Sequence, residues 1–218
     1  MFLLAAIVPP PAVLDAIAVA LESARPSSAV ASPAPPVRRG VIRRLSGRAA
    51  PSAEPVPEPA SGFELIPADQ LTLPIAAFGK LTVGDAAKVA AGLREEARQW
   101  AAPTVWFAGA TLLELPAHRS LALTMDGEVE GLVSLVRSVI QCVQRRGYRF
   151  DRRRFAAQLP VATISDNAPS DLVLGHLNAL ESFQGESWTV AHVSLMKRSF
   201  DGGPTDYLEH ERIPVGAV

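Results

Sequence analysis

Thr72-Leu73-Pro74-Ile75-Ala76 recurs later in the chain as Gln158-Leu159-Pro160-Val161-Ala162. Each copy lies at the start of a predicted strand, over 71–78 and 158–164, and each strand is followed by apolar residues at helical spacing. The elements around the two copies come in a similar order, which indicates an internal duplication. We therefore predict two related halves, each built around one Leu-Pro strand.

The elements outside these strands favour an α+β fold. Hairpin-like strand pairs argue against a doubly wound parallel sheet. We expect one bilobal domain over 1–218. The predicted helices cover 11–23, 84–100, an apolar stripe from Val129 to Val143 that ends at Gly147, and 171–182 with Ser170 as its N-cap. The other predicted strands cover 2–8, 104–113, 119–125, 187–197 and 206–213, with a turn at 202–204.

The stretch 24–61 differs in composition from the rest of the chain. It carries eight of the 19 prolines together with many alanines and serines. Such a segment buries too little apolar surface to offset its ordering entropy, so we predict a disordered Pro/Ala/Arg-rich insertion. Within it, five arginines flank a few apolar residues over 37–48, which predicts contact with an acidic protein partner or a membrane surface. Arg43-Arg44-Leu45-Ser46 has the shape of a basophilic kinase site, which makes Ser46 a candidate phosphorylation site.

Charge and cysteine usage exclude several classes of function. The net charge of the 218 residues is -1, so no global field favours nucleic acid or an anionic membrane. Cys142 is the one cysteine, which fits a reducing cytoplasm, and we expect it to pack inside a helix. The apolar run at 1–8 is too short for a signal peptide or a transmembrane span. No metal-ligand cluster, phosphate-binding glycine loop or serine elbow is present, so we expect no metal and no cofactor.

Several segments in the right order resemble the RNA ligase T-like family of the 2H phosphoesterase superfamily. This family includes 2'-5' RNA ligases and RNA 2',3'-cyclic phosphodiesterases. The matching segments are 66–75 with Phe78-Gly79, 154–162, the closing run 188–199 with 202–204 and Tyr207, and the opening strand with its helix. The likeness covers everything except the insertion.

The resemblance implies a bilobal fold with pseudo-twofold symmetry, in which each lobe offers one His-x-Thr/Ser motif to a shared groove. The two histidines of the family transfer protons without a metal, and the hydroxyls hold phosphate oxygens. Side chains at positions i and i+2 of a strand face the same way, which places a proton carrier beside a hydroxyl that donates a hydrogen bond to the phosphate.

This chain departs from the family at all four of these positions. Thr72 and Gln158 stand where the family has its histidines, and Pro74 and Pro160 stand where it has the hydroxyls. An amide cannot exchange a proton, a threonine hydroxyl is a poor base, and proline offers no donor. Proline also belongs at strand edges or bulges, so the N–H at each of these positions should be dispensable.

We therefore predict a catalytically inactive binding or adaptor module with a vestigial groove for a nucleotide or an RNA end with a terminal phosphate. Two alternatives stay open: an active enzyme with substituted catalytic residues, and a ligand-free scaffold that presents 24–61. The candidate binding residues are Thr72, Gln158, Arg154, Lys197 and Arg198. Arg154 belongs to an arginine run over 145–154 that either contacts phosphates or forms a solvated loop. The four histidines, His118, His176, His192 and His210, form no His-x-Ser/Thr pair.

Overall fold

The computed structural model describes residues 1–24, 62–114, 119–151, 155–198 and 207–216. The predictions for the insertion, including Ser46 and the segment 37–48, therefore lie outside the described residues. So do His118, Arg154 and the turn at 202–204. Ala24 is the exception within 24–61, because it caps the first helix and is buried.

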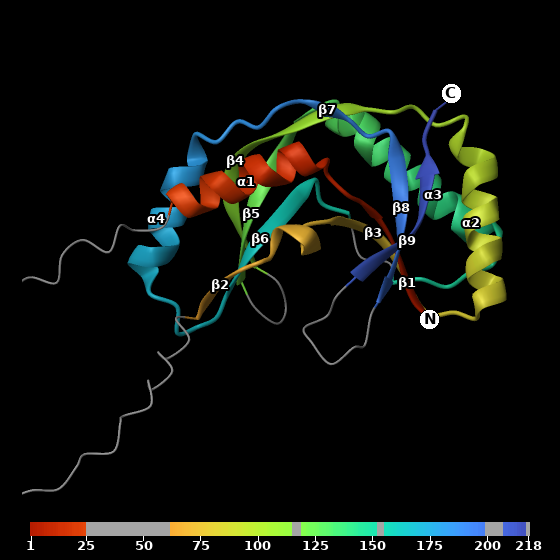
Figure 1. The fold of residues 1–218 in the computed structure, drawn as a ribbon, viewed down its shortest axis with the longest axis horizontal. Coiled ribbons are helices and arrows are strands. Elements are labelled where there is room, and N and C mark those ends of the chain that lie inside the picture. Colours follow the sequence, from red (N-terminus) through yellow and green to blue (C-terminus); the bar gives the residue numbers. More distant parts are fainter. Residues whose placement is uncertain (25–61, 115–118, 152–154, 199–206, 217–218) are drawn as a thin grey trace, which may run out of the picture.

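Two antiparallel sheets and four α-helices make up the fold of the described residues (Figure 1). Sheet A has the strand order β3-β1-β8-β9, and sheet B has the order β2-β6-β5-β4-β7. The strands are β1 (Phe2–Ile7), β2 (Phe63–Leu65), β3 (Leu73–Lys80), β4 (Thr104–Glu114), β5 (Arg119–Gly127), β6 (Gln158–Ile164), β7 (Trp188–Thr189), β8 (His192–Arg198) and β9 (Tyr207–Pro214). The helices are α1 (Pro11–Ser23), α2 (Val83–Ala97), α3 (Val129–Arg145) and α4 (Ser170–Glu181), with a short 3₁₀ turn, η1 (Ala68–Gln70).

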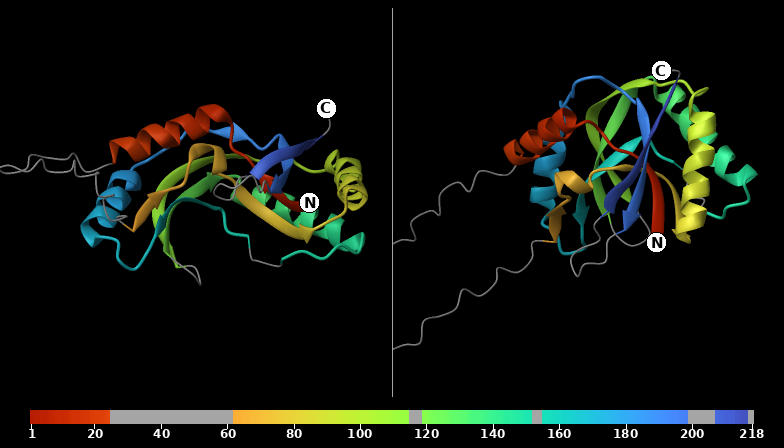
Figure 2. Two further views of the ribbon diagram at one scale, coloured as in Figure 1. Left: turned by 60° about the horizontal axis from the view of Figure 1, so that its bottom comes forward. Right: turned by 45° about the vertical axis from the view of Figure 1, so that its right-hand side comes forward.

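The two sheets have the same internal plan. In sheet A the Leu-Pro strand β3 pairs with β1, which pairs with β8; in sheet B the Leu-Pro strand β6 pairs with β5, which pairs with β4. The first helix of each half crosses to the other lobe: α1 follows β1 but packs against α4, and α3 follows β5 but packs against α2 and β3 (Figures 1 and 2). This arrangement gives the chain the predicted bilobal α+β fold.

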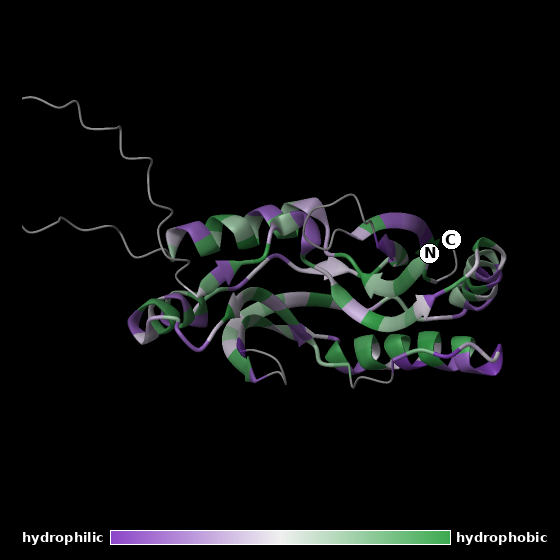
Figure 3. Ribbon diagram, turned by 90° about the horizontal axis from the view of Figure 1, so that it is seen from below, coloured by the Kyte–Doolittle hydropathy of each residue, from purple (hydrophilic) through white to green (hydrophobic). Residues whose placement is uncertain are grey.

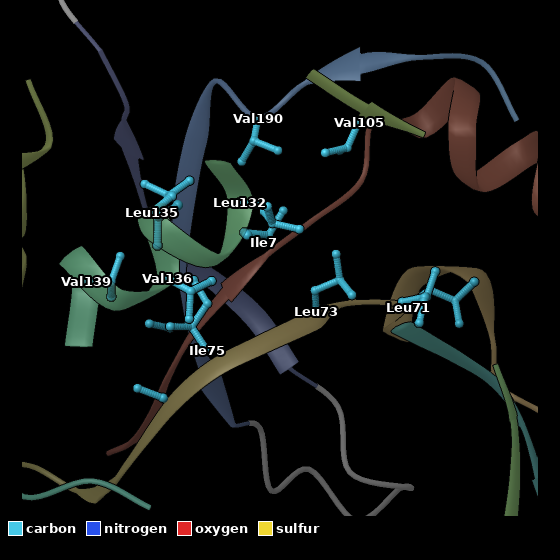
Figure 4. Packing of buried hydrophobic residues seen from close by; sticks show 14 of the residues in the cluster. Ile7, Leu71, Leu73, Ile75, Val105, Leu132, Leu135, Val136, Val139 and Val190 are labelled. Carbon is cyan, nitrogen blue, oxygen red and sulfur yellow. The ribbon is translucent and has the colours of Figure 1, made fainter. Parts of the chain in front are cut away.

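One face of sheet A carries the core. Ile7 of β1 and Ile75 of β3 point toward Leu132 and Val136 of α3 (Figure 4). Hydrophobic and hydrophilic residues alternate around the helices, as Figure 3 shows. The helices therefore cover one face of each sheet with their apolar stripes, and the other face is left for the site described below.

The structure corrects two of the element predictions. Residues 187–197 do not form one strand, because β7 belongs to sheet B and β8 to sheet A. The chain leaves sheet B at Val190 and Ala191 and enters sheet A. The continuous run of strand-forming residues over 187–197 is therefore divided between two sheets. Ser170 is the first residue of α4 rather than its cap, and Pro169 takes the cap position without a side-chain hydrogen bond.

An ionic contact fastens α2 to α3. Arg146 donates to Glu96 at 2.5 Å and to Glu95 at 3.0 Å, and Arg145 also pairs with Glu96. The hydrogen bond from Arg146 holds the pKa of Glu96 below its ordinary value. The Arg146 side chain crosses α2 directly over Gly92, where an added Cβ would collide with Arg146 Nε. Gly92 is therefore needed for this contact rather than for its backbone conformation.

Substitution at Gly92 should show this dependence. A helix interior gains about 1 kcal/mol when glycine becomes alanine. We expect Gly92→Ala to raise the free energy of unfolding by about that amount in an Arg146→Ala background, where the space is free. In the wild-type background the displaced Arg146 should cancel the gain. Urea unfolding of the wild-type protein, the two single variants and the double variant measures the coupling, and an equal effect of Gly92→Ala in both backgrounds would contradict this packing.

Candidate functional site

The two Leu-Pro strands occupy equivalent places in their sheets. Pro74 lies opposite Ala6 of β1, and Pro160 lies opposite Ala122 of β5. A register shift follows at the next residue in both sheets, which leaves Ile75 and Val161 as the extra residues of two matching bulges. The sequence repeat is thus also a repeat of ladder register.

The surroundings of each proline explain why a missing N–H is tolerated. β3 is an edge strand, so Pro74 needs a ladder partner on one side only. β2 pairs with β6 over 162–164 and has no ladder partner at Pro160. A strand edge and a bulge are the places where proline costs a sheet little.

The face of sheet A that carries Pro74, and the face of sheet B that carries Pro160, are called here the motif faces of the two sheets. On sheet A this face carries Leu4, Ala6 and Met196, which form a small apolar cluster separate from the main core. Cross-strand register adds Ser194 and Arg212, which lie in one row with Ala6 and Pro74. The motif face of sheet A is therefore apolar at its centre and polar along β8 and β9.

The polar residues of this face form a connected network. Ser194 is fully buried and donates to Glu209 Oε1 at 2.6 Å. Arg212 donates to both oxygens of Glu209, at 3.1 and 2.8 Å. The Arg212 hydrogen bond, assisted by Ser194, holds the pKa of Glu209 below its usual value. The Glu209 carboxylate is thus ionised and accepts hydrogen bonds from Ser194 and Arg212.

His192 lies on the same face of β8 as Ser194, two residues earlier. Burial lowers the pKa of His192, and the Arg212 charge lowers it further, while Glu209 opposes both. The neutral imidazole is therefore favoured. Two strand spacings, about 10 Å, separate the β8 row from the β3 row that carries Thr72 and Pro74.

On sheet B the residues beside the motif differ in chemistry. Thr124 lies opposite Gln158, and Thr111 and Pro160 flank Ala122. The Thr124 hydroxyl donates to the Ala108 carbonyl. None of these side chains exchanges protons readily near neutral pH.

Gln158 lines a hollow of about 450 Å³. Its other lining residues are Thr124, Met125, Phe155, Ala156 and Ala157. The hollow thus combines an amide, a hydroxyl and an aromatic ring on mostly apolar walls. The hollow is shallow and open to solvent, so it could contact one side of a ligand rather than enclose it.

The remaining candidate residues are placed as follows. Thr72 is half-buried and immediately precedes β3, but it does not line the hollow at Gln158. Arg198 shares the motif face with Ser194 and Met196, whereas Lys197 points to the opposite face, in register with Leu3. Both cations were candidate binding residues from the sequence, and strand alternation places them on opposite faces of sheet A.

The other residues that the sequence singled out have structural roles. Arg145 and Arg146, at the start of the arginine run, are paired with α2 carboxylates. His176 is buried, contacts the Phe63 ring with centroids 4.5 Å apart, and bonds through Nδ1 to the Leu172 carbonyl oxygen at 2.9 Å. Cys142 is buried, and burial raises the pKa of its thiol to about 11.

Sequence reasoning missed the Ser194–Glu209–Arg212 network and the Thr124–Phe155 hollow. The network joins residues 15 positions apart across a hairpin, so its only sequence signal was the charge alternation in the last strand. Phe155 stands next to the recognised 158–162 segment, but nothing in the sequence showed that it borders a hollow.

Among the described residues, no helix combines the length and apolar character that a membrane crossing requires. The same part of the chain brings no three histidine, cysteine or acidic side chains together as a metal site.

No protein-family model and no curated protein matches this chain. Solved structures do match. The protein TT0787 of Thermus thermophilus has 16% identity and a TM-score of 0.59, with 99% of this chain and 98% of that chain covered. E. coli LigT complexed with NADP+ has 16% identity and a TM-score of 0.60, covering 99% and 97%. E. coli LigT complexed with 3'-AMP gives the same identity and TM-score, covering 98% and 97%.

These similarities establish the fold. The chain has the bilobal 2H phosphoesterase-like fold that the sequence resemblance implied, over nearly the whole length of both partners. At this level of identity the chemistry has to be argued from the residues of this chain.

The charge environment of His192 can be tested directly. Arg212→Gln removes a cation that lowers the pKa of His192, so that only burial remains to oppose Glu209, which raises this pKa. We therefore expect the pKa of His192 to move upward, toward its ordinary value. Side-chain NMR titration measures the change. Lys88→Gln, which removes an exposed charge on α2, serves as the control, and an equal response in the two variants would refute the proposed network.

Proposed function

We propose that this chain is a non-catalytic binding module with a 2H phosphoesterase-like fold, and that it holds a nucleotide or an RNA end with a terminal phosphate. One observation carries this proposal. Pro74 of β3 and Pro160 of β6 lie in equivalent register. The family resemblance aligns the residues two positions earlier, Thr72 just before β3 and Gln158 at the start of β6, with the family's proton carriers.

The case against catalysis rests on what these side chains can do. Losing one general acid or base typically reduces a rate by about 10²–10⁴. Here both positions are substituted, and both phosphate-binding hydroxyls are replaced by a residue without a donor. His192 is an imidazole on the motif face of sheet A, but one proton carrier does not supply the acid and base that the family chemistry needs.

The case for binding rests on the hollow at Gln158. The Gln158 amide can donate to a phosphate oxygen or to a base edge, and Phe155 in the same lining is of the aromatic type on which bases stack. E. coli LigT has been solved with 3'-AMP, ATP and NADP+, which makes a nucleotide the first ligand class to test. Contact between residues 37–48 and a protein partner stays a separate prediction from the sequence.

Binding should depend on the hollow. We expect Phe155→Ala and Gln158→Ala each to weaken the affinity for adenosine 3'-monophosphate by about 10-fold, since stacking and one hydrogen bond are each worth about 1–3 kcal/mol. Isothermal titration calorimetry measures the change. Gln141→Ala, at an exposed glutamine on α3, is the matched control.

Wild-type affinity should equal that of the Gln141→Ala control. If the hollow variants also bind as the control does, the nucleotide site is elsewhere. If none of the proteins binds, the module has no nucleotide ligand of this kind, and the scaffold alternative gains support.

Restoring the missing side chains should restore chemistry. The variant Thr72→His/Pro74→Thr/Gln158→His/Pro160→Thr puts an imidazole and a hydroxyl on the same face of each strand. We expect it to hydrolyse a 2',3'-cyclic nucleotide at a rate at least about 100-fold above the wild-type protein. Product formation followed by chromatography is the measurement.

The paired control keeps the prolines and introduces only the two histidines. A folded fourfold variant without any gain would contradict the assignment that these four positions limit the chemistry. Wild-type turnover that depends on Thr72 or Gln158 would overturn the non-catalytic proposal itself.

A further inference from the structure

The second half of β4 has an outer edge that no described segment of the chain pairs with. On one side, β5 accompanies β4 along almost its whole length (Figure 1). On the other side, β7 pairs only with Thr104 and Val105. The last backbone contact on that side, within the described part of the chain, joins the Gly109 N–H to the Phe183 carbonyl oxygen at 2.8 Å. Residues 110–114 on the side of β4 away from β5 are called here the free edge.

The other edge strands of the two sheets carry features that hinder pairing with another chain. β9 has a register shift and the charged side chains of Glu209, Glu211 and Arg212. β3 has two register shifts and contains Pro74, which has no N–H to offer. β2 and β7 are only three and two residues long. Charges, bulges, proline and short length are the usual means by which sheets protect their edges.

The free edge lacks this protection. Residues 105–113 contain no charged residue and no proline. The register shift of β4 lies between Phe107 and Ala110, before the free edge, and pairing with β5 is regular over 110–114. The three central side chains are only half-buried: Thr111, Leu112 and Leu113. A regular, uncharged and partly exposed edge of this kind favours addition of a further strand.

The sequence of the free edge is complementary to itself in the antiparallel direction. A twofold axis through Leu112 places this residue opposite its own copy and places Thr111 opposite Leu113 of the second copy. Ala110 then faces Glu114 of the second copy, so no like charges oppose each other. Alternate residues of an edge strand direct their N–H and C=O groups outward, and this register forms about four to six hydrogen bonds whichever set of residues faces outward.

A second copy of the chain fits this edge better than a charged peptide does. Acidic or basic side chains of a peptide would find no opposite charge over 105–113. The uncharged side chains of Thr111 and Leu113, in contrast, would pack against each other across the axis. The chemistry of the edge therefore selects an uncharged strand, and the chain carries such a strand itself.

We propose that the chain forms a homodimer by antiparallel pairing of β4 with β4 of a second copy. The two five-stranded sheets B would join into one sheet, with five strands from each copy. Because a twofold axis perpendicular to a sheet keeps its faces, the Gln158 hollows of both copies would open on the same side. The dimer goes beyond the proposed function and does not depend on nucleotide binding.

Sedimentation equilibrium of the full chain, from about 5 µM to about 500 µM, covers the range in which a small interface associates. We expect Thr111→Lys/Leu113→Lys to raise the dimer dissociation constant at least about 10-fold, because each lysine faces a lysine of the second copy. Thr111→Glu/Leu113→Glu should have the same effect. A mixture of these two variants should form a heterodimer at least as tight as the wild-type dimer, because each lysine then faces a glutamate.

The matched control is Val19→Lys/Leu174→Lys, which adds the same charge at exposed apolar positions of α1 and α4. It should dimerise as the wild-type protein does. A wild-type chain that stays monomeric, or an equal loss of association in the control, would overturn the proposal. So would a mixture of the lysine and glutamate variants that does not associate, and recovery in that mixture would show that neither variant had simply failed to fold.

Discussion

The structure depends on one constraint that is met twice: a proline within a paired strand, followed at once by a bulge. At Pro74 and Pro160 the ladder lacks an N–H, and both strands respond with the same register shift opposite Ala6 and Ala122. The shift divides each strand between two environments. Leu73 and Leu159 are buried, while the prolines stay on the face that the helices do not cover. The pseudo-twofold plan of the molecule follows from keeping these two strands equivalent.

The same constraint separates the fold from the chemistry. A strand needs a backbone of suitable register, and Thr72 or Gln158 supplies that as well as a histidine would. Proton transfer needs an ionisable side chain at the same place, and these residues do not supply one. The core and the crossed helices are therefore compatible with the proposed absence of catalytic groups. The motif faces carry a hollow beside Gln158 and a polar network in which the buried Ser194 hydroxyl meets the partly exposed Glu209 carboxylate.

Much of this architecture could be predicted from the sequence because it is encoded locally. The Leu-Pro repeat, the apolar stripe of α3 and the boundaries of α1 are all readable from neighbouring residues. The errors arose where the structure is determined by contacts between residues that are distant in the sequence. Nothing near Val190 shows that the chain changes sheets there. The faces of Lys197 and Arg198 depend on register with β1, and the partners of Ser194 and Arg146 come from other elements. Pairing of this kind is a tertiary property, so residue pattern alone could not supply it.

The central claim is that this fold binds a phosphate-bearing nucleotide without transforming it. Phosphorus NMR of adenosine 2',3'-cyclic monophosphate with the protein in excess observes both events in one sample. The account predicts a shifted or broadened cyclic phosphate signal that persists unchanged over a day. Appearance of a phosphate monoester signal that grows with protein concentration would contradict it, because the remaining side chains would then be sufficient for catalysis.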